Sequence, residues 1–137
     1  MRKLLLCIFS ITLSLILVSC NMDNDVKPMN QLNTKWVSKN PDVFFTVTKD
    51  KGYNVCVGKL KTTEKNYSSM FDFDEGREVN IIDYDIFEKN NYLSTMKDLI
   101  ARGDCKFSKD KCIVTIKQSY IDSIKVGDRI TLVKQES

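Results

Sequence analysis

The chain has 137 residues, with 21 Lys and Arg against 18 Asp and Glu, and a formal net charge of +3. This length corresponds to one domain, and a composition with 42% hydrophobic residues, 5 Gly and 2 Pro excludes a disordered or fibrous protein. A charge this close to zero argues against a general nucleic-acid binder. The sequence has no histidine, which excludes Ser-His-Asp and Cys-His catalysis as well as histidine metal sites.

The N-terminal segment has the pattern of a secretory signal. Two basic residues follow Met1 and precede an almost wholly apolar run over residues 4–18. This run has the length of a signal-peptide core and is shorter than the roughly 20 residues that a membrane-spanning helix needs. It ends in the tetrapeptide Leu-Val-Ser-Cys at residues 17–20, after which the chain is polar.

The tetrapeptide at residues 17–20 resembles the lipobox of bacterial lipoproteins. The resemblance implies that a diacylglycerol is attached to the thiol of Cys20, that the signal is cut just before this residue, and that the lipid holds the protein on a membrane outside the cytoplasm. Asn21 stands where an Asp commonly retains Gram-negative lipoproteins at the inner membrane, so the resemblance favours the outer membrane. In a Gram-positive owner the domain would be displayed on the cell surface. The alternatives are an ordinary secretory signal cleaved near Ser19 and an uncleaved anchor helix.

The sequence therefore divides into three parts. Residues 1–19 form the predicted signal peptide, and residues 20–31 form a lipidated cysteine with a polar, flexible tether. Residues 32–137 form a single predicted domain, which Leu32 and Trp36 open.

Three cysteines remain in the predicted domain, at positions 56, 105 and 112. An odd number allows at most one disulfide within the chain. We expect this bond between Cys105 and Cys112, which flank a predicted hairpin turn. The alternatives are a bond from Cys56 to either of them and three buried, unpaired thiols. Without histidine or a CxxC spacing, no metal site is expected, and no cofactor is expected either.

Alternation of apolar and polar residues predicts a series of short strands after residue 41. These strands cover residues 42–49, 53–60, 69–73, 78–83, 98–107, 112–117 and 129–134. In the first of them Val43, Phe45 and Val47 share a face, and Phe44 points the other way, toward a second apolar surface or a cavity. In the strand over residues 53–60, alternation places Tyr53, Val55 and Val57 on one face and Asn54 and Cys56 on the other. Residues 84–97 are ambiguous, and we expect a short helix or loop near 90–97.

Seven or eight short strands joined by tight turns predict a mainly β fold, an antiparallel barrel or sandwich. Trp36 followed by serial hairpins resembles the lipocalin-like small domains of bacterial lipoproteins. The segments at residues 36–45 (WVSKNPDVFF) and 107–112 (FSKDKC) also resemble small uncharacterised lipoproteins. An OB-like barrel is the alternative fold. The resemblance implies no activity.

The stretch from Asp72 to Glu88 is acidic, and its start is similar to a calcium loop. An EF-hand needs a Glu six residues after its central Gly, and Ile82 occupies that position after Gly76, so this interpretation fails. We expect Asp72 and Asp74 on the outer face of a hairpin. A looser cation site that uses Asp83 and Asp85 is the alternative.

Three functions are consistent with the sequence. The first is a surface binding module whose outer wall meets a protein or glycan partner, and the second is a lipocalin-like carrier of a small apolar ligand. An enzyme is the least favoured, because the chain contains no recognisable catalytic motif. One Trp, 5 Tyr and all but one of the 7 Phe lie after Cys20, and so many rings favour a filled interior over a roomy one.

Overall fold

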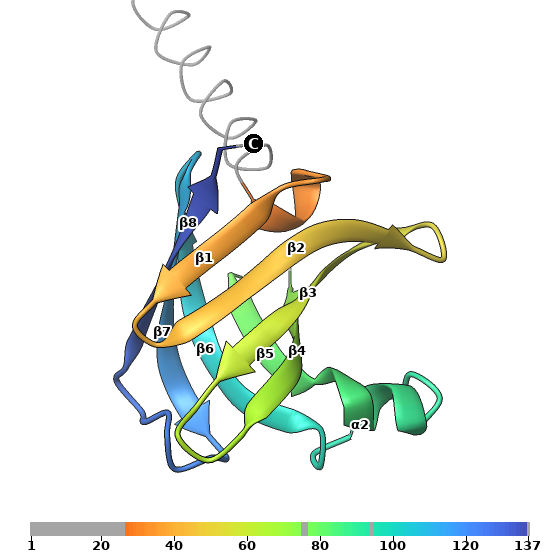
Figure 1. Cartoon of the computed structure of the whole chain (residues 1–137), viewed down its shortest axis with the longest axis vertical. Helices are drawn as coiled ribbons and strands as arrows, with labels where there is room; N and C mark the ends of the chain where they lie inside the picture. The colour runs from red at the N-terminus through yellow and green to blue at the C-terminus, as the bar shows by residue number, and fades with distance from the viewer. Residues whose placement is uncertain (1–26, 75–76, 94, 137) are drawn as a thin grey trace, which may run out of the picture.

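The computed structural model describes residues 27–74, 77–93 and 95–136, and these form a closed antiparallel β-barrel. Each strand pairs with the next along the chain, and β8 returns to pair with β1 (Figure 1). The strands are β1 (Lys35–Lys39), β2 (Asp42–Asp50), β3 (Tyr53–Lys61), β4 (Asn66–Phe73), β5 (Glu78–Asp83), β6 (Leu99–Phe107), β7 (Lys111–Ser119) and β8 (Arg129–Gln135). The prediction of a mainly β fold is thereby confirmed as an eight-stranded, lipocalin-like small barrel.

The OB-like alternative is wrong, and so is a sandwich. An OB-fold is a five-stranded Greek-key barrel, whereas here the strands follow one another around the wall in chain order. Full closure also removes the unpaired edges that two separate sheets would leave. The predicted signal peptide, Cys20 and the turn at residues 75–76 lie outside the described residues.

Of the short helix or loop expected near 90–97, the described residues of that stretch form turns and loop, and the helix lies earlier in the chain. The α-helix of the described residues is α2 (Tyr84–Lys89), directly after β5. Asp83 begins it, because the side-chain carboxylate of Asp83 accepts a hydrogen bond from the backbone N–H of Ile86 at 3.4 Å. Tyr92, Leu93 and Met96, whose spacing also fits a helix, belong instead to the turns and loop that lead into β6.

The barrel interior is filled by aromatic rings from several strands. Trp36 and Phe45 stack with ring centroids 6.2 Å apart, and Phe45 reaches Phe71 at 5.0 Å. Phe73 continues the contact to Phe107 at 5.7 Å. Aromatic pairs at these separations attract one another beyond the area that they bury. The interior rings therefore hold opposite walls of the barrel together.

Register explains which face of β3 points inward. Val47 lies opposite Cys56 and Val43 lies opposite Leu60, so these residues share the inner face. The same register turns Val55 outward, although alternation alone leaves the choice of face open. Position 58, between Cys56 and Leu60 on the same face of β3, requires glycine, because a Cβ there would overlap the carbonyl oxygen of Phe44 on β2.

The packed part of the chain begins before residue 32, where we expect the domain to start. The 3-10 helix η1 (Pro28–Asn30) lies against the barrel, with Pro28 buried and Met29 packed on the core. The side-chain amide of Asn54 on β3 donates a hydrogen bond to the backbone oxygen of Met29 at 2.9 Å. Part of the predicted tether is therefore fixed to the barrel.

Cys56, Cys105 and Cys112 are all buried and are free thiols, so the predicted bond between Cys105 and Cys112 is not present in this structure. The register gives the reason: Cys105 lies opposite Val114, and Phe107 lies opposite Cys112, so the two thiols are not directly paired across the strands. Burial raises the pKa of Cys56 and of Cys105 to about 12, which keeps both as neutral thiols at physiological pH.

Within the described ranges, no helix has the length and apolar character needed to cross a bilayer. The same residues contain no group of three or more Cys, Asp or Glu side chains arranged to hold a metal ion.

Candidate functional site

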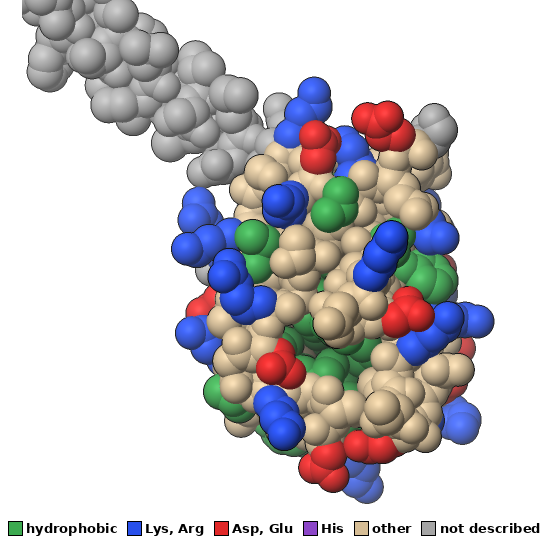
Figure 2. Space-filling model, turned by 60° about the vertical axis from the view of Figure 1, so that its left-hand side comes forward, with side chains coloured by type: hydrophobic (Ala, Val, Ile, Leu, Met, Phe, Trp, Pro, Cys, Tyr) green, Lys and Arg blue, Asp and Glu red, His purple; other side chains and the backbone are tan. Residues whose placement is uncertain are grey.

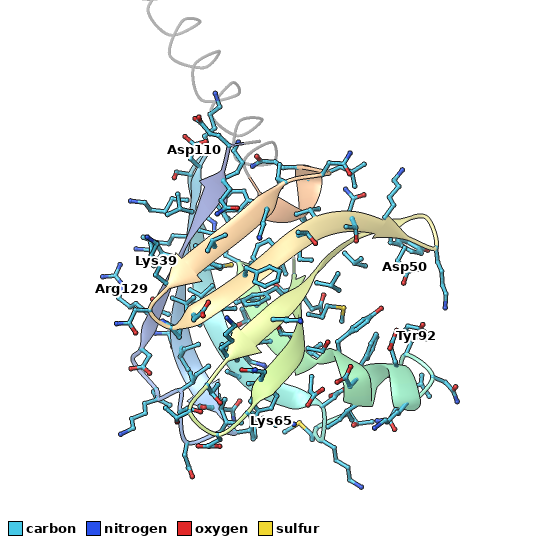
Figure 3. All side chains as sticks on the ribbon, in the orientation of Figure 1. Lys39, Asp50, Lys65, Tyr92, Asp110 and Arg129 are labelled. Carbon is cyan, nitrogen blue, oxygen red and sulfur yellow. The ribbon has the colours of Figure 1, made fainter. Side chains whose placement is uncertain are left out.

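A groove of about 370 Å³ lies on the outer wall of the barrel, between α2 and the end of the β2–β3 hairpin. Figure 3 shows Asp50 on the hairpin and Tyr92 after α2 on the same side of the molecule, with the hairpin above the helix. The lining residues are Asp50, Lys51, Tyr53, Val55, Met70, Asp72, Ile82, Tyr84, Phe87 and Tyr92. The volume falls in the range of small ligand-binding pockets.

The back of the groove is an apolar strip across three neighbouring strands. Val55 on β3, Met70 on β4 and Ile82 on β5 all line it, and Met70 lies directly opposite Ile82. Outward positions of an antiparallel sheet that faces water are ordinarily polar. Ile82 is only 3% exposed although it points away from the interior, because α2 covers this part of the wall. The outer wall is therefore apolar where the helix and the groove lie.

α2 and the residues after it supply the lower side of the groove. The Tyr84 and Phe87 rings lie 6.2 Å apart, and the Phe87 ring meets the Tyr92 ring edge to face at 5.5 Å. The backbone N–H of Tyr92 donates to the carbonyl of Phe87 at 3.0 Å, which ends the helix. Three rings in succession thus form a continuous aromatic wall.

The turn that carries Tyr92 holds a strained backbone. Asn91 and Tyr92 have φ values of 56° and 62°, in the left-handed region that non-glycine residues rarely adopt. The loop is closed by Asp98, whose fully buried carboxylate accepts the backbone N–H of Thr95 at 3.0 and 3.1 Å. Such strain persists only where surrounding contacts fix the chain, and it concentrates at functional positions. The backbone conformation at Tyr92 accompanies the contact of its ring with Phe87 on the side of the groove.

The upper side of the groove is the tip of the β2–β3 hairpin. Lys51 and Gly52 have φ values of 48° and 88°, so the two-residue turn has positive φ at both central positions, as a type I′ turn requires. This turn reaches over α2 and places the ammonium nitrogen of Lys51 3.9 Å from the centre of the Tyr92 ring. A cation at that distance is attracted by the π face of the ring.

Carboxylates set the charge of the groove. Asp50 and Asp72 line it, and neither forms an ion pair within the described part of the chain. Burial, and then the neighbouring charge of Asp74, raises the pKa of Asp72 above its ordinary value. Burial, followed by the charge of Glu88, likewise raises the pKa of Tyr84. A raised pKa at both acids is the mark of a partly desolvated, electronegative site.

Two other hollows differ from this groove. One, near the ends of β1 and β8, is lined by polar residues only: Asn33, Thr34, Lys35, Lys134, Gln135 and Glu136. The other, at the β1–β2 turn, is lined by Asn40, Pro41, Ser123, Ile124, Asp128, Arg129 and Ile130. Neither of these two is lined by an aromatic ring. Over the face seen in Figure 2, Lys and Arg side chains alternate with Asp and Glu around a hollow with a hydrophobic floor.

The structure separates the residues that the sequence singled out. Asp72 and Asp74 lie on the outer face as expected, whereas Asp83 begins α2 and forms an ion pair with Lys65 at 3.4 Å, which are structural roles. Phe44 points away from the core as expected, but it lies beneath the ammonium of Lys35 at 4.6 Å and does not line the groove. Cys20 lies outside the described residues.

The residues of the groove carry no motif that predicts a role from the sequence. Their signal was present on β3, where Val55 and Val57 form an apolar face opposite Cys56, so that both faces of one strand are partly apolar. A strand of this kind in a small barrel needs a cover on its outside. The order of the chain does not say that α2 and the hairpin tip supply it.

No family model, no curated protein and no solved structure matches this chain.

Proposed function

We propose that this protein is a membrane-anchored, extracytoplasmic binding module, and that the groove beside α2 takes a polypeptide partner. The observation that carries the proposal is the apolar and aromatic strip on the outside of the barrel, where a wall facing water would be polar. Exposed tyrosine side chains are typical of protein-binding surfaces, because one end is apolar and the other hydrogen-bonds.

The apolar surface continues beyond the groove, and this favours a polypeptide over a glycan. Tyr53 is 77% exposed at the rim, and the loop after α2 exposes 69% of Leu93 and 65% of Met96. Aliphatic side chains of this kind match the hydrophobic centre of a protein interface. A sugar would use rings and polar groups and would leave the aliphatic part uncovered.

The membrane attachment rests on the lipobox at residues 17–20. Fully extended, residues 20–27 span at most roughly 25 Å. A lipid on Cys20 would therefore hold the barrel close to the bilayer, and the groove would meet partners at the membrane surface. Two or three acyl chains give stable anchoring. Replacing Cys20 by Ser is expected to release the protein from the membrane fraction, and a variant that still sediments with membranes would contradict the anchor.

Site-specific photo-crosslinking in intact cells tests the binding module. A photoreactive amino acid is placed at Tyr53, at the rim of the groove, and at Val133, a control position that is 45% exposed on β8. We expect one discrete protein adduct from position 53, no such adduct from position 133, and loss of the adduct when Phe87→Asp places a charge in the groove. The same adduct at both positions, or adducts with lipid alone, would overturn the proposal.

The carrier of an apolar ligand is tested by native mass spectrometry. The stacked rings from Trp36 to Phe107 occupy the interior, so we expect the bare mass of the lipidated chain. A small molecule that leaves only on denaturation would favour the carrier instead.

A further inference from the structure

The groove already holds one cationic head group, which is its own Lys51. The ammonium nitrogen lies 3.9 Å from the centre of the Tyr92 ring, so the aromatic face and the approach to it fit a lysine side chain. Lys51 is exposed and sits at the tip of a two-residue turn, where its side chain is not part of the barrel. It can leave the ring at little cost to the fold.

The rest of the groove is complementary to positive charge. Two carboxylates, Asp50 and Asp72, line it against the single ammonium of Lys51. Aromatic rings present a negative π face, so Tyr84, Phe87 and Tyr92 act in the same direction as the carboxylates. An anionic partner would meet repulsion from both.

From this juxtaposition we propose that a Lys or Arg side chain of the partner polypeptide enters the groove. Its methylene stem packs on Val55 and Met70, its cationic head replaces the Lys51 ammonium on Tyr92, and Asp72 balances its charge. This inference rests on the proposed function and names the chemistry of the segment that is bound. Lys51 then acts as an internal competitor, which covers the ring when no partner is bound.

The test uses the full lipidated chain in detergent micelles and a short peptide of alternating lysine and glycine. NMR shifts of the Phe87 and Tyr92 ring signals report binding. We expect the lysine peptide to shift these signals and a glutamate peptide to leave them unchanged. A norleucine peptide keeps the stem without the charge, and we expect it to bind about two- to fivefold more weakly than the lysine peptide. Equal binding of the lysine and norleucine peptides would overturn the inference.

Variants with opposite expected signs make the test sharper. Lys51→Met removes the competing ammonium and keeps the length of the side chain, so it should tighten binding by about two- to fivefold. Asp72→Asn, at a strand position where the backbone is unchanged, should weaken it by a similar factor, as should Tyr92→Leu. Asp104→Asn also removes one exposed negative charge but lies outside the groove, and it should change nothing. Weaker binding by Lys51→Met would overturn the competitor role.

Two outcomes separate this inference from the proposed function. If the lysine peptide binds in the groove but no protein adduct forms in cells, the proposed function fails and the cation site stands. If adducts form but lysine and norleucine peptides bind alike, the proposed function stands and this inference fails. Binding of tetramethylammonium without binding of the lysine peptide would overturn the assignment to a polypeptide side chain.

Discussion

The interior of the barrel and the groove on its outer wall are both built from aromatic rings, but the rings differ in type and in exposure. Inside, Trp36 and Phe45 are fully buried and stack on further Phe rings. Outside, the groove uses the exposed Tyr53 and Tyr92 and the half-buried Tyr84, and carboxylates line the same groove. Rings that only hold a fold have no need of hydroxyl groups, exposure or nearby charge. The groove has all three, which sets it apart from the core and supports a role in recognition.

The largest expected effect separates the two regions by stability. Phe45→Ala removes the ring at the centre of the interior stack and should lower the free energy of unfolding by about 3–5 kcal/mol. Tyr53→Ala removes a ring that is 77% exposed at the groove, and it should change stability by less than about 0.5 kcal/mol. Urea denaturation measures both. Similar losses for the two variants would break the distinction between core and groove.

The next effect concerns the three interior thiols and alkaline pH. Burial raises the pKa of Cys56 and Cys105 from 9.0 to about 12 and raises that of Cys112 as well. The unfolded chain loses these protons near pH 9, whereas the folded chain keeps them. The stability that the thiols contribute is therefore fully present below pH 9 and is lost as pH rises toward 12.

Each thiol contributes at most about 1.4 kcal/mol per pH unit to this loss. Urea denaturation between pH 8 and pH 10.5 measures it, with Cys56→Ala as the control for other groups that titrate in this range. The variant should lose stability less steeply with pH than the parent chain does. In addition, a thiol reagent at pH 8 should react slowly with the folded chain and quickly in urea. Fast reaction with the folded chain would contradict the burial of the thiols.

The strands were predictable from the sequence because their physical signals are local. Alternation in residues 42–49 and the turn chemistry at Gly52 each lie within a few residues, and both predictions are confirmed. The choice between helix and loop near 90–97 stayed open in the sequence because Tyr92, Leu93 and Met96 have helical spacing. The capping carboxylate of Asp83 instead begins the helix at Tyr84. Propensity alone does not decide between the two positions.

The groove was not predictable in the same way, because it joins segments that are distant in the chain. Tyr53 and Tyr92 come together only when the barrel closes and the β2–β3 hairpin reaches over α2. The choice among the cysteine alternatives, of which the structure has the three buried free thiols, depends on distant segments too. Cys105 and Cys112 flank a turn, but the register, which the whole barrel sets, places Val114 opposite Cys105.

The smallest expected effect lies in the groove and has the opposite sign to those of the core. Partial burial raises the pKa of Asp72, so its charged form lowers the stability of the folded state at neutral pH. This loss disappears as pH falls through the raised pKa to below the ordinary value of 3.8. Asp72→Asn should therefore stabilise the chain at pH 7, by less than about 1 kcal/mol because water screens an exposed carboxylate.

Thermal denaturation at pH 7 and pH 3 measures this gain, which should vanish at the lower pH. Asp104→Asn is the matched control. Asp104 forms an exposed ion pair with Lys117 at 3.6 Å, so its loss should give no gain at pH 7. If Asp72→Asn also weakens the binding of a lysine peptide, one substitution raises stability and lowers recognition. A residue that a chain retains at a cost to its own fold is the pattern expected of a binding site. A loss of stability at pH 7 in Asp72→Asn would instead place Asp72 among the groups that hold the barrel together.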